Sequence, residues 1–275
     1  MFDIGVSLSP NKSEFGPLLF SGNLIKGMEN AKHLGYSGVE LSLLDSREIK
    51  QEWLMDKLEE SSLKVYAIAT GQTYYTDGYS LYSEEKDKRQ KTIERLKGHI
   101  DFAARLGSTV IIGGIRGKIT TKSEEVDELE ERGKLALNVC VKYAEGKGVI
   151  LLLEPVNRYE TNVINTLDEG LDLIEEIGSD HLKLLPDTFH MNIEERSFEE
   201  SIARAGSRIG YIHFADSNRM APGWGHIDFP MILRSLKKIK YSGPIGIEVL
   251  PKPDDLSAAE QAVYYLNSIW KEIDK

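Results

Sequence analysis

The chain has 275 residues, and 34 Lys and Arg against 44 Asp and Glu give it a formal net charge of −10 at pH 7. An acidic surface repels phosphate backbones, so we expect no nucleic acid partner. The chain has no run of about 18 apolar residues, no basic N-terminal leader and only one cysteine, Cys140, so we expect a cytoplasmic protein without a membrane span.

Eight short apolar runs rich in β-branched residues predict β-strands along the whole chain. In chain order they are 2–8, 38–44, 64–70, 108–114, 148–154, 182–187, 209–215 and 243–250. The segments between them, such as 23–35, 91–107 and 124–148, carry apolar residues at the spacing of an amphipathic helix. Some of these segments stop at a glycine, as at Gly35, Gly107 and Gly178, which is typical of a left-handed helix C-terminus.

This alternation predicts the fold class. Strands that alternate with helices pair in parallel, and eight such units with nearly continuous apolar strands indicate a closed (β/α)₈ TIM barrel, an α/β fold. No linker rich in Gly, Ser or Pro divides the sequence, so we expect one domain over residues 1–275. A doubly wound open sheet is the alternative, although no G-x-G-x-x-G follows the first run.

Polar side chains end the last four predicted strands. Glu154, Asp187, His213 and Glu248 lie at or near these ends. The C-terminal ends of barrel strands meet at one mouth, so we expect the four side chains to converge. Three carboxylates and an imidazole suit Mn²⁺, Mg²⁺ or Co²⁺, and such an ion would offset the cost of ending a buried strand in a glutamate.

A long polar loop, 213–229, follows the seventh predicted strand and is a candidate substrate loop. The alternative is an ordinary surface loop. The loop contains Asp216, which we interpret as a residue that orients a metal ligand. It also contains Trp224, which either covers the site or packs against the barrel rim. His190 lies three residues past Asp187, beside the same predicted site.

Longer motifs resemble a known family. The segments EPVNRYETNVINT, PDTFHMNIEE, HFADSNR and IGIEVL resemble the sugar-phosphate isomerase/epimerase superfamily of xylose isomerase-like barrels, and within it the ketose 3-epimerases related to D-tagatose 3-epimerase. The match covers the C-terminal half well. In the N-terminal half, AIATGQ and IIGGIRG look closest to a sub-branch that acts on keto sugar acids such as 5-keto-L-gluconate, whereas 7–22 departs from the aromatic-rich start of free-ketohexose epimerases.

This resemblance implies roles for particular residues. Glu154, Asp187, His213 and Glu248 would bind one divalent metal ion, Mn²⁺ before Mg²⁺ or Co²⁺, and Glu154 and Glu248 would form the acid/base pair. By the same comparison Glu160, His190 and Arg219 would bind the substrate. Arg116 is a further candidate, beside Arg219, for meeting an anionic group. The family also implies a homodimer or homotetramer.

The implied reaction is epimerisation of a carbon next to the carbonyl of a ketose or keto sugar acid, through a cis-enediolate. Two glutamates on strands five and eight can flank a sugar, so that one removes a proton and the other returns it to the opposite face. An aldose–ketose isomerase and an inositol-type ketone dehydratase remain alternatives on the same site. A nuclease would need more histidines and a basic face, and a non-catalytic sugar-binding barrel would not need both glutamates.

Overall fold

The computed structural model describes residues 2–13, 16–47, 49–120 and 126–273. Within these residues, eight parallel strands form one sheet in the order β6-β5-β4-β3-β2-β1-β8-β7. Two parallel bridges, Leu184 to Ile209 and Asp187 to His213, join the two ends of that order and close the barrel. The strands are β1 Ile4–Leu8, β2 Gly38–Ser42, β3 Lys64–Ala69, β4 Thr109–Ile112, β5 Leu151–Leu153, β6 Leu182–Leu184, β7 Ile212–Phe214 and β8 Ile245–Ile247.

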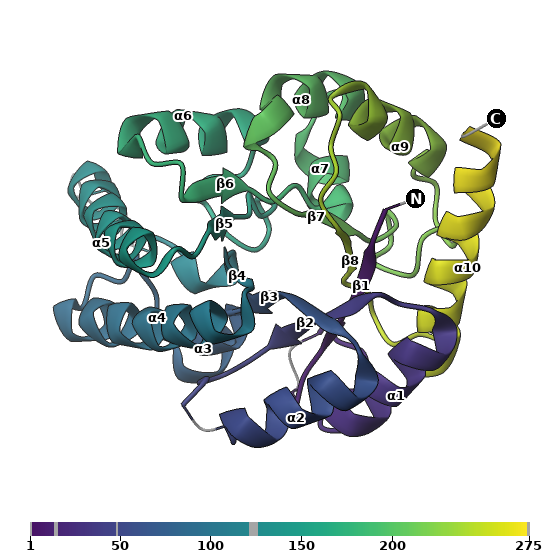
Figure 1. The fold of residues 1–275 in the computed structure, drawn as a ribbon. Helices are drawn as coiled ribbons and strands as arrows, with labels where there is room; N and C mark the ends of the chain where they lie inside the picture. Colours follow the sequence, from purple (N-terminus) through teal and green to yellow (C-terminus); the bar gives the residue numbers. More distant parts are fainter. Residues whose placement is uncertain (1, 14–15, 48, 121–125, 274–275) are drawn as a thin grey trace.

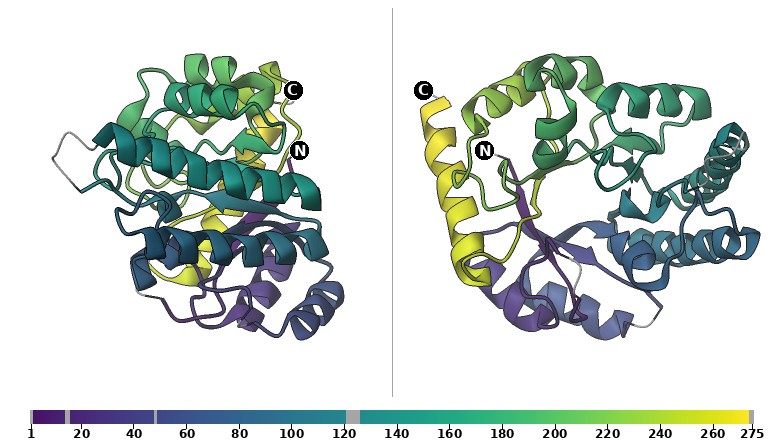
Figure 2. Two further views of the ribbon diagram at one scale, coloured as in Figure 1. Left: turned by 90° about the vertical axis from the view of Figure 1, so that its left-hand side faces the viewer. Right: turned by 180° about the vertical axis from the view of Figure 1, so that it is seen from behind.

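The α-helices surround this ring of strands (Figure 1). They are α1 Leu24–Leu34, α2 Gln51–Ser61, α3 Gly71–Asp77, α4 Lys86–Leu106, α5 Val126–Lys147, α6 Leu167–Ile177, α7 Thr188–Glu194, α8 Phe198–Ala205, α9 Phe229–Lys238 and α10 Asp255–Ile273, with short 3₁₀ turns η1 Gly114–Arg116 and η2 Gly206–Arg208. The long helices α4 and α5 lie side by side on the outside (Figure 2). None of the helices in the described residues is long and apolar enough to cross a membrane.

The predicted barrel is confirmed, and the open-sheet alternative is wrong. Each of the eight predicted runs contains a strand, although most observed strands are shorter than the runs. The predicted helices at 23–35 and 91–107 correspond to α1 and α4, and 124–148 corresponds to α5, with residues 124–125 outside the described part. The glycines that end α1, α4 and α6 have φ of 87°, 64° and 69°, which is the left-handed conformation expected of them.

Two tyrosine rings fill the barrel at the end where its strands begin. Tyr66 on β3 and Tyr211 just before β7 have ring centroids 6.5 Å apart. A Cβ atom on Gly38 would lie 2.4 Å from the Tyr66 ring, and one on Gly246 would lie 2.4 Å from the Tyr211 hydroxyl. The glycines therefore make the room that the rings occupy, and this end of the barrel is packed with side chains.

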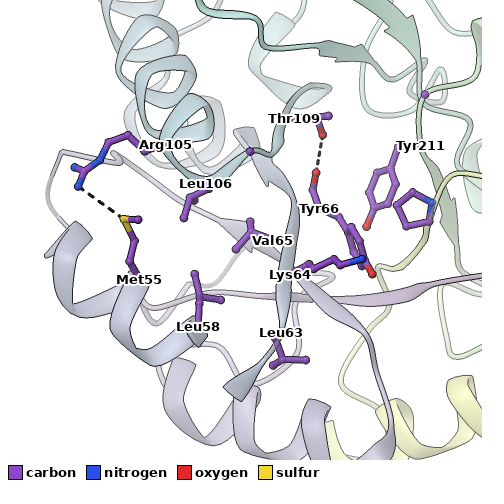
Figure 3. Close-up of a pocket in the computed structure, with 13 residues that line it drawn as sticks. Met55, Leu58, Leu63, Lys64, Val65, Tyr66, Arg105, Leu106, Thr109 and Tyr211 are labelled. Carbon is purple, nitrogen blue, oxygen red and sulfur yellow. Dashed lines mark hydrogen bonds between the residues drawn. The ribbon is translucent and has the colours of Figure 1, made fainter. Parts of the chain in front are cut away.

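Outside these rings lies a hollow of about 590 Å³ at the N-terminal end of the barrel. Figure 3 shows Tyr66 and Tyr211 on one side of it and Met55, Leu58 and Leu106 on the other, with Lys64 and Arg105 beside them. In barrels of this kind the N-terminal end contributes stability, and chemistry belongs to the opposite mouth.

Candidate metal centre and substrate pocket

The four predicted metal ligands converge at the C-terminal mouth. Glu154 follows β5, Asp187 lies three residues past β6, His213 is the middle residue of β7, and Glu248 follows β8. One ligand atom from each of the four lies within 4.8 Å of all the others. All four side chains are buried. The sequence-based expectation that consecutive strands bring these groups together is confirmed.

The cluster has the polar atoms that a cation requires. Three of its buried atoms have no hydrogen-bond partner among the described residues: Glu154 Oε1, Asp187 Oδ2 and His213 Nδ1. His213 Nδ1 lies 3.4 Å from Glu154 Oε1 and 3.7 Å from Glu248 Oε2. Buried polar atoms are nearly always satisfied in folded proteins, and one divalent ion would satisfy this set. Carboxylate oxygens with one imidazole nitrogen fit Mn²⁺, Mg²⁺ or Co²⁺.

Burial perturbs the acids of the cluster. Desolvation raises the pKa of Glu248 to about 8, against the opposing effects of His213 and Arg219. Desolvation likewise raises the pKa of Asp187. Burial alone would lower the pKa of His213, but the carboxylates around it, Glu40 and Glu248 first, place it well above its usual value. Without a cation, burial among these charges therefore shifts the three groups toward their protonated forms.

Glu40 is a part of the site that the sequence analysis missed. It lies in the middle of β2 with no exposed surface. Its Oε2 lies 2.7 Å from His213 Nε2, and its Oε1 accepts a hydrogen bond from Ser7 Oγ at 3.0 Å. A carboxylate at this nitrogen favours the tautomer with hydrogen on Nε2, which turns the Nδ1 lone pair toward the cluster. The available signal was an acid within the buried strand GVELS.

The two carboxylate oxygens of Asp187 have different roles. Its Oδ1 accepts a hydrogen bond from the backbone N–H of Phe189 at 2.7 Å and caps the N-terminus of α7, while Oδ2 faces the cluster. Gly113 also serves the site, because a Cβ atom there would lie 2.0 Å from Glu154 Oε2. The glycine at 113 is therefore explained by the space that the Glu154 carboxylate needs, whereas a Cβ atom on Gly114 would lie 2.8 Å from the Tyr75 ring.

Arg116 does not face the substrate pocket, and the expectation that it meets an anion is wrong. Its side chain is only 1% exposed. Nη2 donates to the backbone carbonyl of Glu154 at 2.6 Å, and Nε donates to that of Gly113 at 3.2 Å. Burial lowers the pKa of Arg116 to about 10. This arginine fixes the backbone on both sides of the site, and its partners are main-chain oxygens that no side-chain pattern reveals.

The three predicted substrate residues form one connected network. Arg219 Nη2 donates to Glu248 Oε2 at 2.5 Å, and its Nη1 lies 3.1 Å from His190 Nε2. Asn157 Nδ2 lies 2.7 Å from His190 Nδ1 and donates to Glu160 Oε1 at 2.9 Å. Arg219 also stacks on Phe189, with 4.6 Å between the guanidinium carbon and the ring centroid. Asn157 was not among the predicted site residues.

The substrate loop is held by Asp216, which does not touch the metal cluster's imidazole. Asp216 accepts backbone hydrogen bonds from Ser217, Gly223 and Ile227 at 2.7, 2.8 and 3.1 Å. A Cβ atom on Gly225 would lie 2.1 Å from its carboxylate, so a glycine is needed there. The interpretation of Asp216 as an orienting residue for a metal ligand is wrong, since it shapes the loop that carries Arg219.

A small cavity at the cluster opens into a larger hollow. Glu154, Glu248 and His190 line the cavity. The hollow has a volume of about 1080 Å³ and extends toward the loop after β1. Tyr75, Glu160 and Arg219 line both spaces. A molecule that reaches the carboxylates therefore has room for its remaining atoms in the hollow.

A closed eight-stranded barrel with a buried cluster of carboxylates and imidazole at its C-terminal mouth is the arrangement of a metal-dependent TIM-barrel enzyme. Residues 28–269 match the family described as the xylose isomerase-like TIM barrel, and the chain belongs to that family.

Comparison with named proteins indicates which enzymes of this family the chain is similar to. An L-ribulose 3-epimerase of Methylomonas sp. (strain DH-1) is 34% identical over 249 residues, covering 87% of this chain and 85% of that protein. A solved L-ribulose 3-epimerase superposes with a TM-score of 0.86 at 27% identity and covers 100% of this chain and 96% of that one. A Methylomonas sp. D-allulose 3-epimerase solved with D-allulose has a TM-score of 0.81 at 26% identity, covering 98% of each chain. These relatives are sugar epimerases, so the prediction of a carbohydrate isomerase is confirmed at the level of the family.

Proposed function

We propose that this protein is a divalent-metal-dependent epimerase that inverts the carbon next to the carbonyl of a ketose, C3 of a 2-ketose. The observation that carries the proposal is the pair Glu154 and Glu248. Their carboxylates come from strands β5 and β8, lie in one cluster with Asp187 and His213, and line the same small cavity. Relatives named as ketose 3-epimerases support the same reaction.

The two glutamates would act as the acid/base pair. One carboxylate, ionised, removes the proton from C3 on one face of the substrate, which gives a cis-enediolate. The other, protonated, returns a proton to the opposite face, and the direction of reaction decides which glutamate is the base. A bound divalent ion, held by Glu154, Asp187, His213 and Glu248, would supply Lewis-acid polarisation of the carbonyl.

Arg219, His190 and Glu160 would bind the substrate. The guanidinium of Arg219 is a planar fork that suits adjacent sugar oxygens. Burial and the positive charge of Arg219 hold the pKa of His190 well below its usual value, so His190 would contact a hydroxyl as a neutral imidazole. Glu160, tied to Asn157, would accept a hydrogen bond from another hydroxyl.

The remaining parts of the proposal rest on the sequence and on the family resemblance. The substrate would be a small ketose or keto sugar acid, and Mn²⁺ would be the preferred ion. We further propose a single domain over 1–275, a cytoplasmic location and a homodimer or homotetramer. The proposal includes neither a nucleic acid partner nor a membrane partner.

A panel of sugars tests the reaction. L-ribulose, D-psicose and 5-keto-L-gluconate would be incubated with Mn²⁺ in D₂O, and the products read by NMR. We expect epimerisation with deuterium at the inverted carbon and no product with Glu154→Gln. Conversion to an aldose would indicate an aldose–ketose isomerase, loss of water would indicate a dehydratase, and no turnover of any sugar would reject the proposal.

A further inference from the structure

A buried glutamine, Gln72, lies at the C-terminal mouth of the barrel, outside the network described above. It is the second residue of α3 and is only 2% exposed. Its Nε2 donates to Ser9 Oγ at 3.0 Å, to Ser42 Oγ at 2.9 Å and to the backbone carbonyl of Ser42 at 3.0 Å. A backbone carbonyl only accepts hydrogen bonds, so this contact identifies the facing atom as nitrogen and fixes the orientation of the amide.

The other end of the same amide is unused. Over the described part of the chain, no donor bonds to the Gln72 carbonyl oxygen Oε1. This oxygen is not fully enclosed by protein, so part of its surface stays accessible. Gln72 lines the 1080 Å³ hollow. A nearly buried amide whose nitrogen is fully engaged thus presents a fixed acceptor to the hollow.

The position of Gln72 relates this acceptor to the proposed chemistry. Ser42, which anchors the amide, lines the small cavity that Glu154 and Glu248 also line. Gln72 lines the adjoining hollow. The acceptor therefore lies at the junction of the two spaces. A ketose with its carbonyl end at the carboxylates would extend its later carbons through this junction.

We propose that Gln72 is a specificity-determining residue whose Oε1 accepts a hydrogen bond from a substrate hydroxyl beyond the reacting carbon. The proposal rests on the epimerase function above. When a sugar binds, it displaces water from the fixed, nearly buried acceptor. An analogue without the matching hydroxyl leaves that acceptor without a hydrogen bond, so it binds less tightly. The site would thus require a hydroxyl on a carbon beyond C3, whether the chain ends in a hydroxymethyl or a carboxylate group.

Deoxy sugars combined with a matched pair of variants test this role. The substrates are D-psicose and its analogues that lack the hydroxyl at C4, C5 or C6. Gln72→Met keeps the length of the side chain and removes the acceptor. Ser9→Ala removes one anchor of Nε2 and leaves Oε1 in place. Elemental analysis and melting temperature check that each variant folds and holds its metal.

We expect the wild-type protein to prefer D-psicose over one of the deoxy analogues by about tenfold or more in kcat/KM. Gln72→Met should lose about the same factor, tenfold or more, on D-psicose, mainly through KM, and leave that analogue unchanged, so that the preference disappears. Ser9→Ala should keep the preference. A preference that persists in Gln72→Met, or a wild-type protein indifferent to every hydroxyl beyond C3, would overturn the assignment.

Calorimetric Kd values for the same sugars separate this inference from the proposed function. If the wild-type protein turns over no ketose, the epimerase proposal fails, and the binding preference still shows whether Gln72 reads a hydroxyl. If turnover occurs and Gln72→Met changes neither kcat/KM nor Kd selectively, the epimerase proposal stands and the inference about Gln72 fails.

Discussion

The two ends of the barrel both carry a hollow, yet their charged groups are arranged in opposite ways. At the N-terminal end, Lys64 and Arg105 stand 72% and 44% exposed and pair with Asp3 and Glu52 at 3.6 and 3.0 Å. At the C-terminal end, three carboxylates and an imidazole are buried within 4.8 Å of one another, and three of their atoms have no hydrogen-bond partner in the described chain.

This difference distinguishes a hollow that only forms part of the fold, at the N-terminal end, from one that can carry out chemistry, at the C-terminal end. Exposed ion pairs contribute about 0–1 kcal/mol each and place few demands on the surrounding chain. Buried acids that face one another cost several kcal/mol and persist where a function, such as holding a cation, requires them. The volume of a hollow is therefore a poor guide to its role, and the convergence of buried charged groups is a better one. The two ends should respond differently to matched substitutions.

The largest difference is expected from Glu154→Gln and Glu248→Gln. The amide keeps an oxygen but cannot exchange a proton, so kcat for epimerisation should fall by about 10²–10⁴-fold in each variant. Product NMR and elemental analysis would measure turnover and bound metal on the same samples. Lys64→Gln, at the other end of the barrel, should leave kcat unchanged. Near wild-type kcat in either glutamate variant would contradict the two-glutamate mechanism.

Arg219→Ala should have the next largest effect. Hydrogen bonds to charged groups are worth about 1.5–3 kcal/mol, so kcat/KM should fall by roughly 10- to 100-fold while bound metal is retained. Arg219→Lys should also impair the enzyme, since an ammonium group lacks the fork geometry. The matched control is Arg105→Ala, which breaks the exposed pair with Glu52 and the contacts with Gln51 and Met55, all at the other end of the barrel. Unchanged kinetics with a slightly lower melting temperature in Arg219→Ala would mean that Arg219 is a structural residue.

Glu40→Gln should weaken metal binding without touching the ligand set. Removing the partner of a metal-binding histidine typically lowers metal affinity by about 10- to 100-fold. Calorimetric titration of the metal-free protein with Mn²⁺ measures this directly, with no need for substrate. Ser7→Ala, which removes only the hydrogen bond from Ser7 to Glu40, should have a smaller effect. An unchanged Kd in Glu40→Gln would show that Glu40 does not position His213.

The pH dependence of stability should also distinguish the buried site. The folded pKa of Glu248, about 8, lies above its ordinary value of 4.5, and that of His213 lies well above 6.5. Groups with a raised folded pKa stabilise the fold at low pH and lose that contribution as pH rises through the folded value. The metal-free protein should therefore be less stable at pH 8 than at pH 6.5, and added Mn²⁺ should raise Tm more at pH 8.

Glu248→Gln removes one of the titrating groups and should flatten this difference. Melting curves at the two pH values, with and without Mn²⁺, make the measurement. A metal-free protein whose Tm is the same at pH 6.5 and 8 would mean that the buried acids take up no proton on folding, and so are ionised as readily as exposed ones.

Much of the fold and the centre of the site could be predicted because both depend on pattern. Apolar runs of strand length recur eight times, and polar residues at the ends of four of them converge once the strands are parallel. Glu154, Asp187, His213 and Glu248 follow from this geometry alone. The residue at which each strand ends was harder to predict. The sequence pattern of each run continues past the last backbone hydrogen bond between neighbouring strands.

The presence of Glu40 and the actual roles of Arg116 and Asp216 escaped prediction for a different reason. Glu40 occupies the middle of a buried strand, where its partner lies 173 positions away in the sequence. Arg116 bonds to main-chain carbonyls, which every residue has, and Asp216 bonds to main-chain N–H groups of its own loop. Contacts of this kind depend on how the backbone turns, and sequence patterns carry little information about that.

The smallest expected effect compares two tyrosines of the N-terminal end. The Tyr66 hydroxyl donates to Ser37 Oγ at 2.9 Å, whereas the Tyr211 hydroxyl is buried and has no hydrogen-bond partner within the described residues. Tyr66→Phe loses a hydrogen bond worth about 0.5–1.5 kcal/mol and should lower Tm by roughly 1–6 °C. Tyr211→Phe removes an unsatisfied buried group and should leave Tm unchanged or raise it. Neither should alter kcat, because phenylalanine keeps the ring, including the contact of the Tyr211 ring with His213, whose centroids lie 5.3 Å apart. Equal losses of Tm in the two variants would show that ring packing, rather than the hydroxyl groups, governs this end of the barrel.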